Sequence, residues 1–313
     1  MRSRRGVALI TALWLVVGIA VVVMQFSLDA RERRVLGIHA AERGVERAAA
    51  AGALAVVRAR LDQALRARSL DGAGVAGLRS SDPWLDADSL YSGIVMVDST
   101  PVEVRVRDVG AKLDINLLGE DELKTSLGLM LNNYSTADQL AQAIMDWRDA
   151  DDIPRLRGGE RDDYLRAGLL ALPANGQFRE VDDLLLVRGM TPEILAVIRP
   201  YFTTRGQTAI NLNTAPAPVL RAVPGMSDAI LAQILSLRSQ GRRIESALQV
   251  MGPAPRGRRV GELQGRTTVE TTSLELTFIA RSAPQAPPIR LLAIARRLGN
   301  GPERYTSVTW KEW

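Results

Sequence analysis

Cysteine is absent from this chain of 313 residues, and histidine occurs once, as His39. Without cysteine there are no disulfides and no thiolate metal sites. One histidine leaves almost no material for a histidine zinc site or a Ser-His-Asp triad, and no other nucleophile and base pair is evident. We therefore expect no catalytic residues and no enzymatic activity. His39 itself lies in an Ala- and Arg-rich helical stretch, which favours a solvated helix residue.

Aromatic residues are also few. They make up 4 % of the chain, which disfavours an aromatic stacking surface for single-stranded nucleic acid. Lysine and arginine total 40 against 35 aspartate and glutamate, and a net charge of +5 spread along the chain does not require a nucleic-acid partner. The hydrophobic content of 46 % is enough for one or two domains with their own cores.

A long uncharged run lies near the start of the chain. Arg2, Arg4 and Arg5 precede Gly6, and the 22 residues from Val7 to Leu28 carry no charge. As a helix this run is about 33 Å long, enough to cross a bilayer once. The arginines before it predict a cytoplasmic N-terminus. A cleaved secretory signal peptide is the alternative, but it would have an apolar run of about 7–15 residues and then an Ala-x-Ala site, which is missing here.

The glycine between the basic leader and the apolar run carries a resemblance. Gly6 followed by Val7-Ala-Leu-Ile-Thr-Ala-Leu-Trp resembles the prepilin-type (type III) signal of type IV pilins and type II secretion pseudopilins. The resemblance implies that a prepilin peptidase cuts between Gly6 and Val7 and methylates the new N-terminal Val7. Most members of that family have Glu at the fifth mature position, where this chain has Thr11.

The helix is predicted to continue beyond the apolar run. Residues 29–68 contain no proline and are rich in helix formers, and Leu54, Val57, Leu61 and Leu65 form one apolar stripe. We predict a helix of up to about 60 residues, apolar all round in its first half and amphipathic in its second. A plain membrane anchor with a helical stalk is the alternative. Residues 71–83 are rich in Gly, Ser and Asp and predict a loop.

Strand patterns lie on both sides of a helical block. The strand candidates are residues 92–97, 102–109, 112–118, 267–281, 288–296 and 305–310. The pattern is helical from residue 119 to about Met251, and a linker follows at 252–259. We predict an α+β fold, in which the long helix packs on a small antiparallel sheet and a large all-α domain is inserted between the strands.

The helical block contains an internal repeat. Residues 187–198 and 223–234 align at an offset of 36, with seven of twelve positions identical. Each copy has a helix, a Gly turn, an N-capping Thr or Ser and a second helix, the pattern of helix-hairpin-helix (SAM-like) repeats. The second copy resembles the hairpins of competence-type DNA receptors, but Thr191 and Ser227 replace their second Gly. We favour a structural pair, with a membrane-anchored competence-type DNA-binding protein as the alternative.

Seven carboxylates fall within the 18 residues 146–163, which read DWRDADDIPRLRGGERDD. Charges so crowded repel unless cations lie among them. The four interleaved arginines can do this, and so can calcium, which takes about six to eight oxygens and tolerates irregular loops. The EF-hand pattern fails because the required Gly and final Glu are missing. The open alternatives are a salt-bridged loop, a calcium site and a catalytic carboxylate pair in a membrane-bound hydrolase.

These motifs together resemble one family. The prepilin-type signal, the acidic motif, Phe178-Arg-Glu-Val-Asp-Asp-Leu and Ile210-Asn-Leu-Asn-Thr-Ala occur in the order typical of the K-type minor pseudopilin (GspK) of the type II secretion system. The resemblance implies a pilin-like α/β body, an inserted helical domain and calcium in that domain. The candidate calcium ligands are Asp149, Asp151, Asp152, Glu160 and Asp163.

The resemblance also implies partners, place and domains. The expected partners are I- and J-type minor pseudopilins, the major pseudopilin, prepilin peptidase and the inner-membrane assembly platform. The protein is expected to cross the inner membrane once, with its bulk in the periplasm, until it joins the pseudopilus tip and helps initiate assembly and protein export across the outer membrane. The expected segments are 1–6 as leader, 7–28 as membrane and filament-core helix, 29–117 with 265–313 as pilin-like body, and 118–255 as inserted domain.

Thr11 agrees with a place at the tip. In a pilin filament the fifth-position Glu is thought to neutralise the N-terminal ammonium of the neighbouring subunit. A tip subunit has no subunit above it, and an unpaired carboxylate in an apolar core is costly. A neutral Thr11, able to bond to its own helix carbonyls, avoids that cost.

Overall fold

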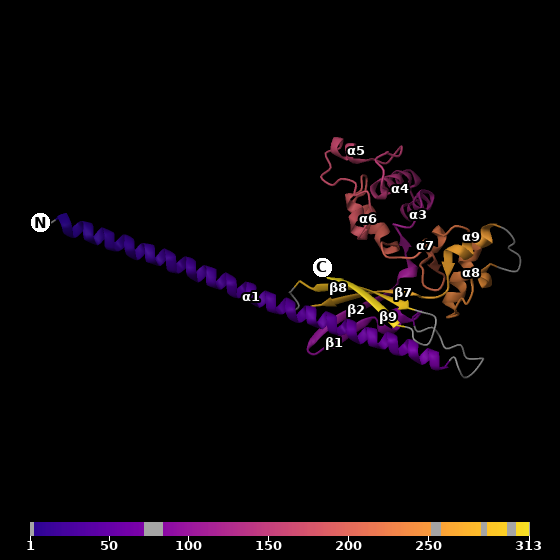
Figure 1. Ribbon diagram of the computed structural model, residues 1–313, viewed down its shortest axis with the longest axis horizontal. Helices are drawn as coiled ribbons and strands as arrows, with labels where there is room; N and C mark the ends of the chain where they lie inside the picture. The colour runs from indigo at the N-terminus through magenta and orange to yellow at the C-terminus, as the bar shows by residue number, and fades with distance from the viewer. Residues whose placement is uncertain (1–2, 72–83, 252–257, 283–286, 299–304, 313) are drawn as a thin grey trace.

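A long helix and a five-stranded sheet form one part of the computed structural model, and a group of short helices forms the other (Figure 1). The structure describes residues 3–71, 84–251, 258–282, 287–298 and 305–312. The loop predicted at 71–83 and the linker predicted at 252–259 fall almost entirely outside these ranges, as do Met1 and Arg2 of the leader.

Helix α1, Ser3–Asp71, runs for 69 residues without interruption. It contains no proline, and the good helix formers Ala, Arg, Leu and Glu dominate its second half. Among the described residues it is the one helix long and apolar enough to cross a membrane, and every side chain from Leu13 to Leu28 is exposed. The prediction of a single long helix is confirmed, and the helix is longer than predicted.

Five strands form the sheet, in the order β1-β2-β7-β8-β9, and every neighbouring pair is antiparallel. Strand β2 alternates strictly between buried and exposed side chains, which is the pattern of a strand with one face on a core. The short helix α2, Ala87–Tyr91, precedes β1. The strand bounds are Gly93–Val97 for β1, Thr100–Asp108 for β2, Ser273–Ala280 for β7, Ile289–Leu298 for β8 and Tyr305–Glu312 for β9.

The sheet packs its buried face on the second half of α1. Val57 and Leu61 of the predicted stripe are fully buried there, and Leu54 is partly buried. Helix and sheet approach closely at Gly52, because a Cβ at this position would be 2.8 Å from Cγ1 of Val97 in β1. The other buried residues of α1 in this core are Ala49, Ala50 and Ala53.

The helical block is inserted between β2 and β7, as predicted. Its α-helices are α3 (Glu120–Leu131), α4 (Tyr134–Arg148), α5 (Arg161–Arg166), α6 (Pro192–Ile198), α7 (Ala217–Ala222), α8 (Asp228–Ser239) and α9 (Arg258–Arg266). Its 3-10 helices are η1 (Val109–Ala111), η2 (Val181–Leu186), η3 (Arg199–Tyr201) and η4 (Ala247–Val250). Its two-residue strands are β3 (Leu113–Asp114), β4 (Phe202–Thr203), β5 (Ile210–Asn211) and β6 (Thr267–Thr268).

The strand expected at residues 112–118 does not join the sheet. Only β3 forms there, and it pairs in parallel with β4 inside the helical block. The chain turns immediately afterwards because the Asp114 carboxylate accepts a hydrogen bond of 2.8 Å from the backbone N–H of Asn116. The long strand expected at 267–281 is likewise divided, since β6 pairs with β5 and only β7 enters the sheet.

Two separate hydrophobic cores result. One lies between α1 and the sheet, and the other fills the helical block. The chain passes from the first core to the second between Asp108 and Leu113, and it returns to the first core between Leu263 and Leu274. The α+β fold, with its long helix, antiparallel sheet and inserted helical domain, is confirmed; the domain boundaries predicted at 117/118 and 255/265 stay predictions.

The repeated segments adopt similar turns. Gly189 and Gly225 have φ angles of +85° and +83°, which favour glycine, and Thr191 and Ser227 then cap α6 and α8 by accepting from backbone N–H groups. The element before the first turn is the 3-10 helix η2, whereas α7 precedes the second. The assignment of the pair as helix-hairpin-helix repeats stays a prediction.

Asp108, at the end of β2, joins the two parts of the chain. Its buried carboxylate accepts hydrogen bonds from Asn211 Nδ2 at 2.6 Å, Thr214 Oγ1 at 2.6 Å and Thr271 Oγ1 at 3.1 Å, and from the N–H of Gly110 at 2.9 Å. Burial raises the pKa of Asp108, and these hydrogen bonds oppose the rise. One side chain thus connects the sheet to the inserted domain.

We expect Asp108→Ala to lower the free energy of unfolding by about 3 kcal/mol, because it removes the buried acceptor of three side-chain hydrogen bonds, from Asn211, Thr214 and Thr271. Thermal unfolding of the detergent-solubilised chain, followed by circular dichroism, measures this. Glu103→Ala is the control, because Glu103 lies on the exposed face of β2 and makes only a surface ion pair with Arg105. Equal losses in the two variants would contradict the role given to Asp108.

Candidate metal centre

The acidic motif spans the end of α4, a loop and the start of α5. Asp146 lies in the last turn of α4, Asp149 is the C-cap residue of that helix, and Glu160 is the N-cap residue of α5. The two helix ends therefore fix the backbone at both sides of the loop. Trp147, in the last turn of α4, is buried and stacks on Phe178 with ring centroids 6.0 Å apart.

Asp146 organises the loop. Its fully buried carboxylate accepts hydrogen bonds from Nη1 of Arg155 at 2.6 Å and from the backbone N–H groups of Arg155 at 3.1 Å and Gly159 at 2.7 Å. A Cβ at Gly158 would lie 2.0 Å from Oδ2 of Asp146, so the loop needs glycine beside the carboxylate. Both oxygens of Asp146 are thus used inside the protein.

Three of the predicted ligands come together. Asp149, Asp151 and Glu160 each offer one carboxylate oxygen, and these oxygens all lie within 4.8 Å of one another. Glu160 is 4 % exposed, and within the described residues neither of its carboxylate oxygens has a hydrogen-bond partner; Oδ1 of Asp149 has none either. A cation fits this donor set, because it would supply the positive charge that the buried oxygens lack.

Electrostatics at Glu160 agree with this geometry. Burial, and after it the nearby negative charges of Asp146, Asp149, Asp152 and Asp151 in that order, together raise the pKa of Glu160 to about 7. Each of these causes disfavours the ionised carboxylate when no cation is close. The same group can therefore hold a metal ion, and calcium prefers such an all-oxygen set.

The other two predicted ligands lie outside this group. Asp152 accepts a hydrogen bond of 3.1 Å from Nδ2 of Asn175. Asp163 accepts from the backbone N–H of Glu160 at 3.0 Å and from Arg166 Nη2 at 2.7 Å, so it acts as a helix cap. As metal ligands, Asp152 and Asp163 stay predictions.

Arg155 is the residue of this site that the sequence did not single out from the other arginines of the motif. It forms ion pairs with three carboxylates: Asp146 in α4, Asp149 at the C-cap of α4, and Glu120 in α3. A solvated loop held by salt bridges was one of the open interpretations, and these pairs account for part of the acidic motif. They leave the three unpartnered oxygens of Asp149 and Glu160 unexplained.

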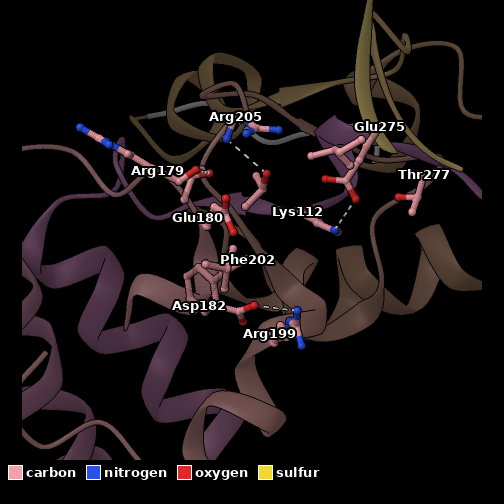
Figure 2. Close-up of a pocket in the computed structure, with 13 residues that line it drawn as sticks. Lys112, Arg179, Glu180, Asp182, Arg199, Phe202, Arg205, Glu275 and Thr277 are labelled. Atoms are coloured by element: carbon pink, nitrogen blue, oxygen red, sulfur yellow. Dashed lines mark hydrogen bonds and ion pairs between the residues drawn. The ribbon is translucent and has the colours of Figure 1, made fainter. Parts of the chain in front are cut away.

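A cavity of about 190 Å³ lies where the helical block meets the outer face of the sheet (Figure 2). Lys112 and Glu275 of β7 pair across it at 3.2 Å, and Arg199 pairs with Asp182 at 2.8 Å on the helical side. The other lining residues labelled in Figure 2 are Arg179, Glu180, Phe202, Arg205 and Thr277. The cavity thus lies at the junction between the helical block and the sheet, and the Lys112–Glu275 ion pair connects the two.

The fold and site define a class, a pilin-like protein with an inserted helical domain. A chain of the crystal structure of the GspK-GspI-GspJ complex from the type 2 secretion system of enterotoxigenic Escherichia coli has this fold. The similarity has a TM-score of 0.62 and covers 84 % of this chain and 94 % of that chain. The two sequences are 17 % identical, so this likeness establishes the fold alone.

Sequence comparison gives the family. Two family models, both described as type II secretion system (T2SS) protein K, match residues 111–206 and 210–249. A type II secretion system protein K from Pectobacterium carotovorum subsp. carotovorum is 27 % identical over 198 residues, covering 57 % of this chain and 58 % of that protein. The alignment therefore spans less than two thirds of the relative. These matches to protein K of type II secretion systems confirm the resemblance over residues 111–206 and 210–249. The comparisons do not support the competence-type alternative.

Proposed function

We propose that this chain is a minor pseudopilin at the tip of the type II secretion pseudopilus, where it helps initiate pseudopilus assembly and protein export across the outer membrane. The observation that carries the proposal is the match of most of the inserted domain, residues 111–206 and 210–249, to protein K models, on a body built from a long helix and an antiparallel sheet. The role is structural and needs no catalytic residue.

Before assembly, α1 anchors the chain in the inner membrane. Its exposed apolar half suits a single crossing, with Arg4 and Arg5 on the cytoplasmic side and the sheet and helical block in the periplasm. Prepilin peptidase then cuts between Gly6 and Val7 and methylates Val7. With neutral Thr11 at the fifth mature position, the shortened helix is suited to a subunit that has no neighbour above it.

Mass analysis of the mature protein tests the processing. We expect loss of residues 1–6 and one added methyl group on Val7 in cells that contain prepilin peptidase. Gly6→Leu should leave the leader uncut, because a side chain at the cleavage position obstructs the peptidase. An intact Met1 in the parent chain, or cleavage near Ala30, would contradict the proposal.

I- and J-type minor pseudopilins are the proposed partners at the tip, and the major pseudopilin and the inner-membrane assembly platform are the proposed partners during growth. The related fold comes from a structure described as a GspK-GspI-GspJ complex. A partner can lie along α1, because every side chain from Leu13 to Arg34 is exposed in the isolated chain.

Affinity capture tests the partnership. The tagged chain, extracted from membranes in mild detergent, should retain co-expressed I- and J-type pseudopilins in constant proportion. A tagged single-span inner-membrane protein of unrelated fold is the control bait. The proposed role at the tip would be overturned if the control bait retained both pseudopilins as well as this chain does. It would also be overturned if this chain retained neither of them.

Calcium is the proposed ion at Asp149, Asp151 and Glu160. Their oxygens supply part of a coordination sphere that loop carbonyls and water would complete. When bound, calcium neutralises the crowded carboxylates and joins the end of α4 to the start of α5.

Chelator should lower the melting temperature of the chain, and calcium should restore it. At a calcium concentration about 100 times the dissociation constant the stabilisation is about 2.7 kcal/mol. Glu160→Gln should abolish most of the calcium-induced shift, whereas Asp162→Asn, at an exposed carboxylate on the same helix, should keep it. A parent melting temperature that is the same with chelator and with calcium would leave the loop as a salt-bridged one.

A further inference from the structure

We propose that Arg155 is a positioning residue for the calcium site, holding one oxygen of Asp149 so that the other faces the ion. The inference rests on the calcium site proposed above and concerns a residue that is not itself a ligand. The observation behind it is a division between the two oxygens of Asp149: Oδ2 is paired with Arg155, and Oδ1 has no partner within the described residues.

The contacts of Arg155 are specific to each nitrogen. Nη1 lies 2.6 Å from Oδ1 of Asp146 and 2.5 Å from Oδ2 of Asp149, so one nitrogen bridges the two carboxylates. Nε donates to Oε2 of Glu120 at 3.1 Å, and Glu120 is the first residue of α3. The guanidinium is therefore fixed on one side by a fully buried carboxylate and on another by a separate helix.

This arrangement determines which way Asp149 presents its free oxygen. The backbone of Asp149 is fixed as the C-cap of α4, where its N–H donates to the carbonyl of Met145 at 2.9 Å. With the backbone and Oδ2 both held, Oδ1 is left in the group with Asp151 and Glu160. Asp149 would then bind the ion through one oxygen, and the site would be arranged before the ion arrives.

A competing effect has the opposite sign. Arg155 carries a positive charge close to the ion, and its removal would strengthen cation binding by Coulomb attraction alone. Positioning should outweigh this effect, because loss of an outer partner that orients a metal ligand typically lowers metal affinity about 10- to 100-fold. Arg157 separates the two effects: it carries the same charge two residues away, is half exposed, and pairs with Asp138 at 3.5 Å and not with the site.

Isothermal titration of calcium into the metal-free, detergent-solubilised full chain tests the proposal. We expect Arg155→Met to weaken calcium binding at least about 10-fold, and Arg157→Met to leave it unchanged or tighter. Arg155→Lys, which keeps the charge but not the bridging geometry, should also weaken binding. Near-ultraviolet circular dichroism of each variant, compared with that of the parent chain, shows whether the packing around the tryptophans is retained.

A double substitution shows whether Arg155 acts through Asp149. On an Asp149→Asn background, Arg155→Met should cause little further loss, because the oxygen that it positions has already been altered. Binding by Arg155→Met as tight as that of the parent, or additive losses in the double variant, would overturn the positioning role while leaving the calcium site intact. A parent chain that binds no calcium would instead overturn the site itself, and this proposal with it.

Discussion

The packing of small side chains on α1 is the constraint on which the rest of the molecule depends. Ala49, Ala50 and Ala53 are buried against the sheet, and Gly52 admits Val97 at a distance that a Cβ would not allow. Larger residues along this seam would hold the sheet away from the helix and open voids beneath it. The chain enters the inserted domain directly after β2. The packing of the sheet on α1 therefore also sets the position of the helical block.

The connection between sheet and block is polar, in contrast to the two apolar cores that it joins. Asp108 receives three side-chain donors, of which Asn211 and Thr214 belong to the segment Ile210-Asn-Leu-Asn-Thr-Ala. Asn213 of the same segment donates to the carbonyls of Ile244 and Val269. The Ile210-Asn-Leu-Asn-Thr-Ala motif, which is one of the motifs that carry the resemblance to the family, thus has a physical role. Its hydrogen bonds connect the two ends of the insertion to each other and to the sheet.

The fold followed from the sequence because its signals are periodic: an uninterrupted helical pattern, alternating strands, and a helical block between them. Residues 112–118 were misread as a strand of the sheet because alternation cannot reveal that the Asp114 side chain will turn the chain. The acidic site was predictable only in part. The acidic motif offered Asp149 and Glu160 among five candidate ligands, but the sequence did not reveal that Asp163 is occupied as a cap or that Arg155 is the arginine on which the carboxylates converge.

The continuity of α1 has a mechanical consequence. Between the end of the apolar run at Leu28 and Glu46, the first of the described side chains of α1 to be buried, lie 17 residues with no proline, a helical segment of about 25 Å. Leaving the bilayer requires the apolar run to travel about 33 Å along its own axis, and no kink or flexible joint in α1 can absorb that travel. In the proposed step from membrane to pseudopilus, the sheet and helical block would therefore be displaced by the same distance, because α1 is one continuous helix.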